Sequence, residues 1–335
     1  MQEYSFFDKG VNCFDYAKYS PLILFTHKYQ HLKEKIRRDA VKYLFADKRH
    51  IFDEIEKVCI EELAKVNQNR SSLDVEHEVE RKLHFSQNQN GFVHNRLSER
   101  CYRIKDQIIA SINDLTLTFS PTDKILDVGA GSGLITQLVK HELEINYALL
   151  TDVVDYRYPE VRSSRGIDFK LFKQPFNKIE TDQKFQVAIT TNTLHHCDHP
   201  KEVFKTMASY LEPGSILFVI ESCIGIDKDY VKSNLHSTKI PCQTLYHENG
   251  SIQSDQLEYL DLTNEEKMIY GIFFDWIYNR VFLNENINVP YNFGHPEDWN
   301  IYFESSNFEV LKTYLMGFDQ PAALEFHTLH VLRKT

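Results

Sequence analysis

Three histidines, a cysteine and an aspartate lie close together in TNTLHHCDHP, residues 191–200. These side chains suit metal binding, proton transfer or helix capping. A metal site needs converging imidazoles, but His195 and His196 are neighbours that point apart if the preceding strand continues, so we expect no metal. As an acid or base, either histidine would follow a strand, where α/β folds place ligands, with a pKa suited to neutral pH. Alternatively, the segment only leads into a helix that begins at Pro200.

A loop of three glycines, DVGAGSG at residues 127–133, follows an apolar run and precedes a stretch with helical spacing. Glycines here let the chain turn tightly and leave backbone amides bare for a ligand, toward which the next helix directs its positive end. Asp152 closes the next apolar run, YALLTD, where nucleotide-binding folds place an acid for ribose hydroxyls. The dinucleotide fingerprint has Gly or Ala where this chain has Leu134, so the pattern indicates a different nucleoside-type cofactor.

Short apolar runs alternate with helical segments from Lys124 onward, and this alternation would position both groups of residues. The runs expected as strands are KILDVG, YALLTDVV, residues 167–172, FQVAITTN and SILFVIES, followed near the end by FEVLKTYL and HTLHVLRK. Such alternation is typical of a doubly wound, mostly parallel sheet with helices on both faces. We therefore predict an α/β fold whose last two strands are joined by a turn.

Two helical additions accompany this predicted sheet. Residues 1–115 carry apolar side chains at helical spacing and predict an N-terminal helical cap, which leaves 116–335 for the cofactor-binding domain. Residues 225–300 separate the fifth strand from the last two and are too many for a bare loop. We predict an inserted lid or substrate subdomain there, with a helix near 265–282. The N-terminal cap either covers the site or forms a dimer or partner surface.

These motifs together resemble the class I S-adenosylmethionine-dependent methyltransferases. The resemblance rests on DVGAGSG, the acid ending the second strand, TNTLHH after the fourth strand and YLEPGSILFVIE leading into the fifth. It covers residues 95–335 and is strongest over 124–222. It implies a Rossmann-like sheet, S-adenosylmethionine as cofactor, and methyl transfer to an O or N atom of a small-molecule acceptor, for example in natural-product biosynthesis.

The resemblance also implies the cofactor-binding residues, which would be Asp127, Gly129, Ala130, Gly131, Gly133, Asp152, Val153 and Asn192. The glycine loop would surround the methionine part, and the acid at 152 would take both ribose hydroxyls. Val153 would pack on adenine, and Asn192 would lie beside the amino-acid end. The chain departs from the family at Gln186, where an Asp often opens the fourth strand. It departs again in LFKQPF, residues 171–176, where many relatives carry an acid for the adenine amino group.

The acceptor side of the predicted site draws on several segments. His195 and His196 would be the catalytic residues, one of them acting as a base if the acceptor must lose a proton. The substrate-binding residues would be Tyr156, Arg157, Glu221, Asp275, Trp276, Tyr291 and Asn292. An alternative stays open for this set, because an aromatic-rich helix often belongs to the core. Arg157 could equally pair with an acidic substrate or with a local carboxylate.

Composition limits the partners. The chain has 335 residues and a formal charge of -10, which argues against a broad surface for nucleic acid or anionic lipid. No apolar run approaches the roughly 20 residues that span a bilayer, and the start lacks the pattern of a secretory signal, so we expect a soluble protein. Six scattered cysteines without a CxxC pair fit reduced thiols in a cytoplasmic protein.

Three other functions fit the same sequence. A tRNA or protein methyltransferase would need a local basic groove. A cofactor-binding subunit without catalysis would support a partner enzyme and lack turnover. A cyclase or decarboxylase on the same fold would use the sulfonium without forming a methylated product.

Overall fold

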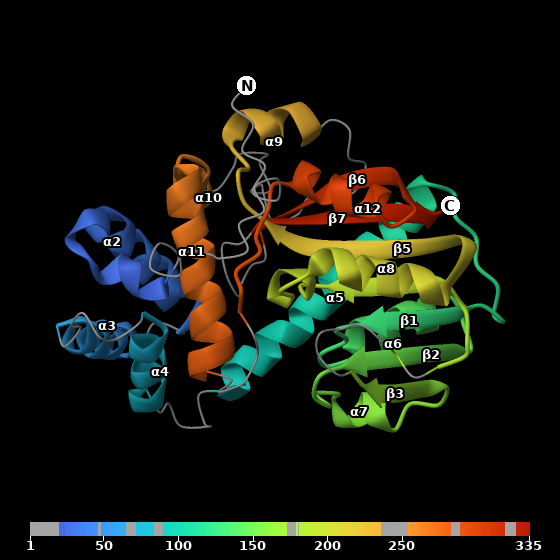
Figure 1. Cartoon of the computed structure of the whole chain (residues 1–335), viewed down its shortest axis with the longest axis horizontal. Helices are drawn as coiled ribbons and strands as arrows, with labels where there is room; N and C mark the ends of the chain where they lie inside the picture. Colours follow the sequence, from blue (N-terminus) through green and yellow to red (C-terminus); the bar gives the residue numbers. More distant parts are fainter. Residues whose placement is uncertain are drawn as a thin grey trace.

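The computed structural model contains a seven-stranded sheet with a helical part beyond the carboxyl ends of its parallel strands (Figure 1). It describes residues 20–45, 48–64, 72–83, 90–172, 179, 181–235, 254–282, 289–318 and 326–335. Most of the predicted departure in LFKQPF lies outside the described residues, which stop at Phe172 in that segment.

The sheet has the strand order β3-β2-β1-β4-β5-β7-β6. Its strands are β1 Lys124–Val128, β2 Tyr147–Asp152, β3 Ile167–Leu171, β4 Phe185–Thr191, β5 Leu211–Cys223, β6 Phe308–Phe318 and β7 Phe326–Lys334. The first five strands pair in parallel, and β7 runs antiparallel between β5 and β6. The predicted α/β fold, with an insertion before the last two strands, is confirmed.

Helices cover both faces of the sheet because its central strands are apolar on both sides. These helices are α5 Asn90–Asp114, α6 Leu134–Glu142, α7 Pro159–Arg162, α8 Pro200–Tyr210 and α12 Asn300–Glu304. On β1, Leu126 joins a core with Phe204 of α8 and Phe303 of α12. The neighbouring Ile125 joins the opposite core with Ile108 of α5. The period of two along a strand thus fills both cores and explains the continuous apolar runs.

The remaining helices come from the N-terminal region and the insertion. They are η1 Pro21–Phe25, η2 His27–Tyr29, α2 Gln30–Asp39, η3 Ala40–Leu44, α3 Arg49–Leu63, α4 Ser72–Lys82, α9 Lys228–Leu235, α10 Ser254–Leu260, α11 Asn264–Trp276, η6 Ile277–Phe282 and η7 Pro296–Trp299. Figure 1 shows α11 beside α2, α3 and α4. The ring of Phe273 in α11 lies 6.2 Å from that of Phe25 and 5.8 Å from that of Phe52. The N-terminal helices and α11 therefore share one apolar core.

Polar contacts also tie α11 to the N-terminal helices. The hydroxyl of Tyr270 donates to Asp39 Oδ2 at 3.0 Å, and Trp276 Nε1 donates to Glu80 Oε1 at 2.9 Å. A capping box formed by Thr263 and Glu266 begins the helix. These contacts hold α11 rigidly against the cap, so its last turn can place a side chain at the sheet edge.

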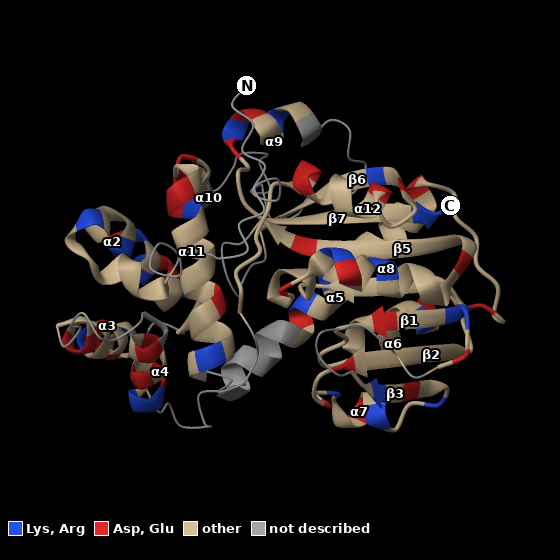
Figure 2. Ribbon diagram, viewed as in Figure 1, with Lys and Arg blue, Asp and Glu red and all other residues tan. Residues whose placement is uncertain are grey.

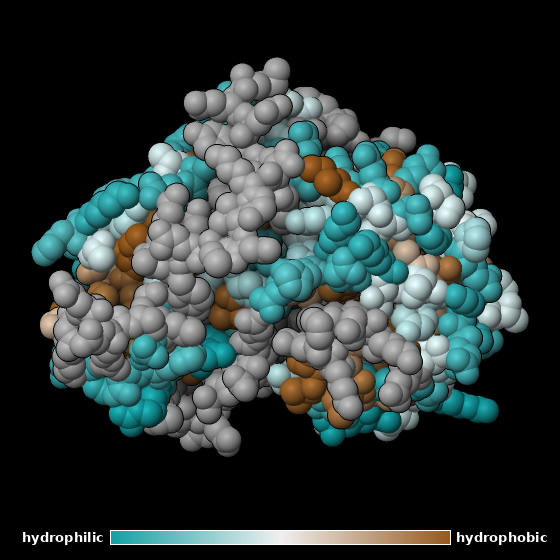
Figure 3. Space-filling model, in the orientation of Figure 1, coloured by the Kyte–Doolittle hydropathy of each residue, from teal (hydrophilic) through white to brown (hydrophobic). Residues whose placement is uncertain are grey.

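The surface of the described residues is mixed in character. Figure 3 shows small apolar patches separated by hydrophilic residues on the face in view. Across the part of the chain that the structure describes, no helix combines the length and apolar character that crossing a membrane requires.

Candidate active site

The glycine loop leaves β1 with all three glycines at positive φ, with values of 75° at Gly129, 51° at Gly131 and 71° at Gly133. A Cβ atom on Gly129 would lie 2.1 Å from Oγ1 of Thr193, so only glycine fits against the turn after β4. A Cβ atom on Gly131 would meet nothing within 4 Å. The loop is therefore packed closely at its start and bare at its middle, where a ligand can approach the backbone.

Asp152 ends β2 directly beside this loop. Its Oδ2 atom accepts a hydrogen bond from the backbone N–H of Gly131 at 2.7 Å, and its Oδ1 atom accepts one from Val153 at 2.7 Å. The side chain is only 8% exposed, and burial raises the pKa of its carboxyl despite these hydrogen bonds. The acid and the loop thus form one preorganised unit, as ribose and methionine binding would require.

Asp127 and Asn192 complete this edge of the sheet. Burial raises the pKa of Asp127 to about 7, although the hydroxyl of Thr136 donates to its carboxylate. Asn192 has a φ of 48°, and its buried Oδ1 has no hydrogen-bond partner among the described residues. A buried acceptor without a donor is costly unless a ligand supplies the donor. The ammonium and hydroxyl groups of S-adenosylmethionine would supply such donors, so these residues fit that cofactor.

A 3-10 turn, η5 (Leu194–His196), follows the end of β4 and carries the predicted catalytic residues. Nδ1 of His195 lies 2.7 Å from Oε2 of Glu221, which is fully buried on the neighbouring strand β5. The other oxygen of Glu221 accepts the backbone N–H groups of Thr193 at 2.9 Å and Leu194 at 2.7 Å. Glu221 therefore fixes both the turn and the orientation of the imidazole.

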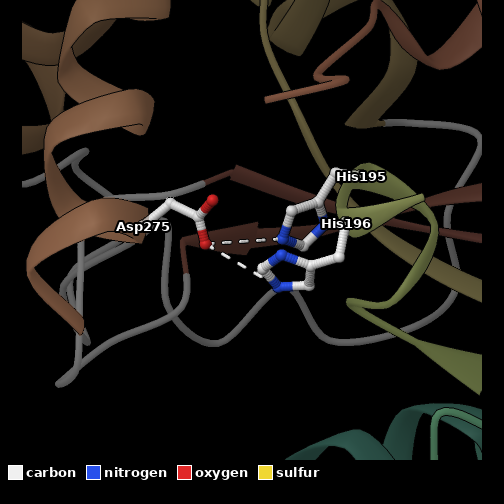
Figure 4. A group of neighbouring side chains, drawn as sticks. All are labelled: His195, His196 and Asp275. Carbon is white, nitrogen blue, oxygen red and sulfur yellow. Dashed lines mark ion pairs between the residues drawn. The ribbon is translucent and has the colours of Figure 1, made fainter. Parts of the chain in front are cut away.

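Asp275, in the last turn of α11, reaches the same place from the helical part (Figure 4). Its Oδ1 atom lies 3.7 Å from Nε2 of His195 and 3.8 Å from Nε2 of His196. The expectation that the two histidines point apart assumed a continuing strand, but β4 ends at Thr191. The turn instead sets the ring centroids 4.1 Å apart, with both rings facing Asp275.

Opposite charges dominate this buried cluster. Burial alone would lower the pKa of His195, but attraction to Glu221 and hydrogen bonding with Asp275 and Glu221 raise it to about 10. Burial would raise the pKa of both carboxyls, but the histidines lower it. At neutral pH His195 of the ligand-free protein is therefore an imidazolium between two carboxylates, and it can act as a base only after losing that proton.

A segment of the insertion closes over the turn. The backbone N–H of Asn292 donates to the carbonyl of His195 at 3.2 Å, and its side-chain Nδ2 donates to the carbonyl of Cys197 at 2.6 Å. The ring of Phe293 stacks on that of His195 with centroids 5.0 Å apart. Tyr291 is buried and has a φ of 57°, a conformation that the surrounding contacts must hold.

Comparison with known protein families decides the class of enzyme. The family model described as a methyltransferase domain matches residues 99–312, well over half of the chain. The chain belongs to this family. It is a methyltransferase, and its cofactor is S-adenosylmethionine, for which the glycine loop and Asp152 provide a fitting site.

Among curated proteins the methyltransferase has no match. Solved structures similar to it include a methyltransferase in complex with the Trm112 activator from Haloferax volcanii. The matched chain of that complex is 12% identical to this one over 71% of this chain and 95% of its own length, with a TM-score of 0.42. A second is an S-adenosylmethionine-dependent methyltransferase from Mesorhizobium loti, with 15% identity over 67% and 98% of the chains and a TM-score of 0.40. A third is the mitomycin 7-O-methyltransferase MmcR, with 13% identity over 70% and 54% and a TM-score of 0.38.

The structure of the methyltransferase brings together only part of the predicted substrate set. Glu221, Asp275 and Asn292 surround the histidine turn. Trp276 instead points into the helical core toward Glu80. Arg157 forms two hydrogen bonds of 2.9 Å with Asp155, the local carboxylate.

The glycine loop, Asp127, Asp152 and Asn192 together form the cofactor edge of the sheet. Ala130 lies within its glycine loop, and Tyr156 lies in the loop after β2. The backbone N–H of Tyr156 donates to the carbonyl of Val154 at 3.1 Å, and that of Ala130 to Thr151 at 3.0 Å. Sequence reasoning missed Thr193, whose hydroxyl packs on Gly129, and Phe293. Thr193 directly follows Asn192, so its place in the TNTLHH motif was the available signal.

Proposed function

We propose that the methyltransferase transfers a methyl group to an O or N atom of a small-molecule acceptor. The observation that carries this proposal is the buried pair of His195 and Glu221, 2.7 Å apart, with Asp275 beside it. This cluster begins three residues after Asn192 of the cofactor edge. Groups that manage a proton and groups that fit the cofactor thus meet at one edge of the sheet.

The cofactor edge would hold S-adenosylmethionine through groups that are already fixed. Asp152 is oriented by two backbone N–H groups and keeps lone pairs free for ribose hydroxyls. The bare backbone at Gly131 admits the ligand, and Asn192 Oδ1 offers an acceptor to the ammonium group. When bound, the cofactor supplies an activated methyl group on a sulfonium, and an attacking atom approaches it in line with the S–C bond.

The histidine turn would prepare the acceptor. A hydroxyl or amine placed beside the imidazolium of His195 has its pKa lowered by the positive charge, which favours the attacking form. Asp275 Oδ2 is buried without a hydrogen-bond partner in the described chain and is placed to take the proton. The S–CH3 bond breaks as the O–CH3 or N–CH3 bond forms. His196, whose side chain is 17% exposed, connects the cluster to solvent.

Two features support a small acceptor over a nucleic acid. The turn packs against Asn292, Phe293 and the end of α11, and His195 and Asp275 are only 4% and 6% exposed, which favours an acceptor small enough to reach buried groups. Many basic residues of the described chain stand among acidic ones (Figure 2), and some of them form ion pairs, such as Arg37 with Asp53. A groove for nucleic acid needs basic side chains that are free to meet phosphates.

The test is formation of S-adenosylhomocysteine with a panel of phenols, hydroxy acids and amines, read by mass spectrometry of the methylated product. His195→Gln should lower kcat by about 10²–10⁴ while leaving cofactor affinity near wild type, and it should also lower Tm because Glu221 loses its buried partner. His199→Gln, an exposed histidine in the same segment, is the matched control. Equal turnover of the two variants would contradict the role of the turn. Methylation of RNA or protein but of no small molecule would overturn the acceptor class.

A further inference from the structure

His195, His196 and Asp275 converge in a manner that proton handling alone does not explain. One ligand-type atom from each lies within 4.8 Å of the other two. Figure 4 shows both rings directed at the carboxylate from the opposite side of a narrow gap. In the neutral form of His195, with Nδ1–H donating to Glu221, Nε2 presents a lone pair to an oxygen of Asp275 that also carries one. These two atoms repel unless a cation lies between them, and that cation is either the second proton of His195 or a metal ion.

Each of two converging side chains has a partner of the type that supports metal ligands. Metal-binding histidines almost always donate their other ring N–H to a carboxylate or carbonyl, and bound carboxylates are themselves hydrogen-bonded. Glu221 accepts from His195 at 2.7 Å, and Asn279 Nδ2 donates to Asp275 Oδ1 at 2.7 Å. Glu221 is in turn held by two backbone N–H groups. This support orients Nε2 of His195 and Oδ1 of Asp275 toward the shared gap.

The net charge of the buried cluster and an unpaired carboxylate oxygen also favour a cation site. Among the described residues, Glu221 and Asp275 form ion pairs only with His195 and His196. If only one of the two histidines is protonated, the two carboxylates leave one negative charge uncompensated in the interior. A divalent cation with two neutral imidazoles would balance both carboxylates. Asp275 is 6% exposed, and its Oδ2 has no hydrogen-bond partner in the described chain. An unsatisfied buried carboxylate oxygen beside two imidazoles is a second mark of a cation site.

We infer that His195 Nε2, His196 Nε2 and Asp275 Oδ1 bind a divalent first-row transition metal, with Zn²⁺ the best match to two imidazoles and one carboxylate. Tetrahedral ligands about 2.0–2.1 Å from zinc lie roughly 3.3 Å from one another. Oδ1 of Asp275 lies 3.7 Å and 3.8 Å from the two imidazole nitrogens, a few tenths of an ångström beyond that spacing. All three ligand atoms lie within 4.8 Å of one another, so binding also draws the two imidazoles together. Binding replaces the expectation of no metal, which depended on histidines that point apart.

Three protein ligands leave a coordination position open, as in catalytic zinc sites. The role of the ion rests on the proposed function, although its binding does not. An acceptor oxygen in the open position has its pKa lowered by the cation, and its proton passes to Asp275 Oδ2. The O–CH3 bond then forms as the S–CH3 bond breaks, with no change in the oxidation state of the metal. The imidazoles act as ligands, and the cation supplies the positive charge that the His195 proton otherwise provides.

The experiment uses the full chain, freed of metal by a chelator, and titrates it with Co²⁺ and Zn²⁺ alone. Visible Co²⁺ absorption and calorimetry should both report one equivalent per chain. His196→Ala should remove the Co²⁺ spectrum and weaken Zn²⁺ binding at least a hundredfold, because it deletes one of the three ligands, the one whose side chain is the most exposed. Glu221→Gln should weaken binding about 10–100-fold. His199→Ala should bind as the wild type does.

Several outcomes separate this inference from the proposed function. No binding to the wild-type chain, or equal binding by His196→Ala and His199→Ala, overturns the metal site. Full methyl transfer by chelated, metal-free protein overturns the role of the ion and leaves the proposed function standing. One equivalent of bound metal with no methylated small molecule from any acceptor supports the site and contradicts the proposed function.

Discussion

The cofactor edge and the histidine turn meet at one side of the sheet, yet they are built in opposite ways. Residues 127–153 supply nearly all of the cofactor edge, within one strand–loop–helix–strand unit. The histidine cluster joins His195, Glu221 and Asp275, which come from a turn, a strand and a distant helix. One region is thus local and the other depends on long-range packing.

This difference has a consequence for stability. The glycine loop is held by hydrogen bonds to its own neighbours, such as that from Gly131 to Asp152. Asp275 reaches the site only because α11 is packed on the N-terminal helices. Loss of helical packing should therefore remove the acceptor side of the site while the cofactor side persists.

The largest expected effect comes from Phe273→Ala, which empties the helical core between Phe25 and Phe52. Truncation of a fully buried phenylalanine costs about 3–5 kcal/mol. Methyl transfer should collapse, while affinity for S-adenosylmethionine falls less than threefold. Chemical denaturation and calorimetry at one temperature measure the two quantities.

Phe204→Ala is the matched comparison, because Phe204 is equally buried but lies in the sheet core. It should weaken cofactor binding together with stability. If both variants weaken the cofactor to the same extent, the two regions are one cooperative unit and the contrast between them fails.

Asp152→Asn tests the local region next. The substitution keeps the shape but removes a charge and one acceptor, and a hydrogen bond to a charged group contributes about 1.5–3 kcal/mol. Affinity for S-adenosylmethionine should fall roughly 100-fold by calorimetry, while Zn²⁺ or Co²⁺ titration stays unchanged. Asp168→Asn, exposed on β3, serves as control. Unchanged affinity of Asp152→Asn would remove this acid from the site.

The same contrast explains how much the sequence can reveal. The sheet, the glycine loop and Asp152 were predictable because strand periodicity and glycine spacing act over a few residues. The packing of Phe273 on Phe25 was not, since nothing local records contacts between residues so far apart. The histidine orientation depended on where β4 ends, and strand ends are poorly specified by propensity. Trp276 lies in an aromatic-rich segment that suggested a substrate pocket, but only the fold shows that its indole N–H donates to Glu80.

A smaller effect is expected from pH, through Asp127. Burial raises its pKa to about 7, so the carboxyl is mostly protonated below that pH in the ligand-free protein. The positive cofactor favours the ionised form, so binding below pH 7 must release this proton. Affinity should rise with pH and be about tenfold weaker at pH 6 than at pH 8. Calorimetry in buffers of different ionisation enthalpy measures the proton release. Asp127→Asn should show no release, and proton release equal to that of wild type would assign it to another group.

The smallest effect is expected from Arg157→Ala, which tests whether Arg157 binds the acceptor or only stabilises its own loop beside the cofactor edge. Arg157 makes two hydrogen bonds with Asp155, and its guanidinium lies 4.5 Å from the centroid of the Phe169 ring. A partly exposed pair of this kind contributes about 1 kcal/mol or less. Arg157→Ala should therefore lower Tm slightly and leave KM for every acceptor within about twofold, because this cation is already engaged by its own loop. A KM that rises tenfold only for acidic acceptors would show instead that Arg157 leaves Asp155 to bind the acceptor. The acceptor site would then include a residue of the loop after β2, and so would draw on the local region as well as on the long-range one.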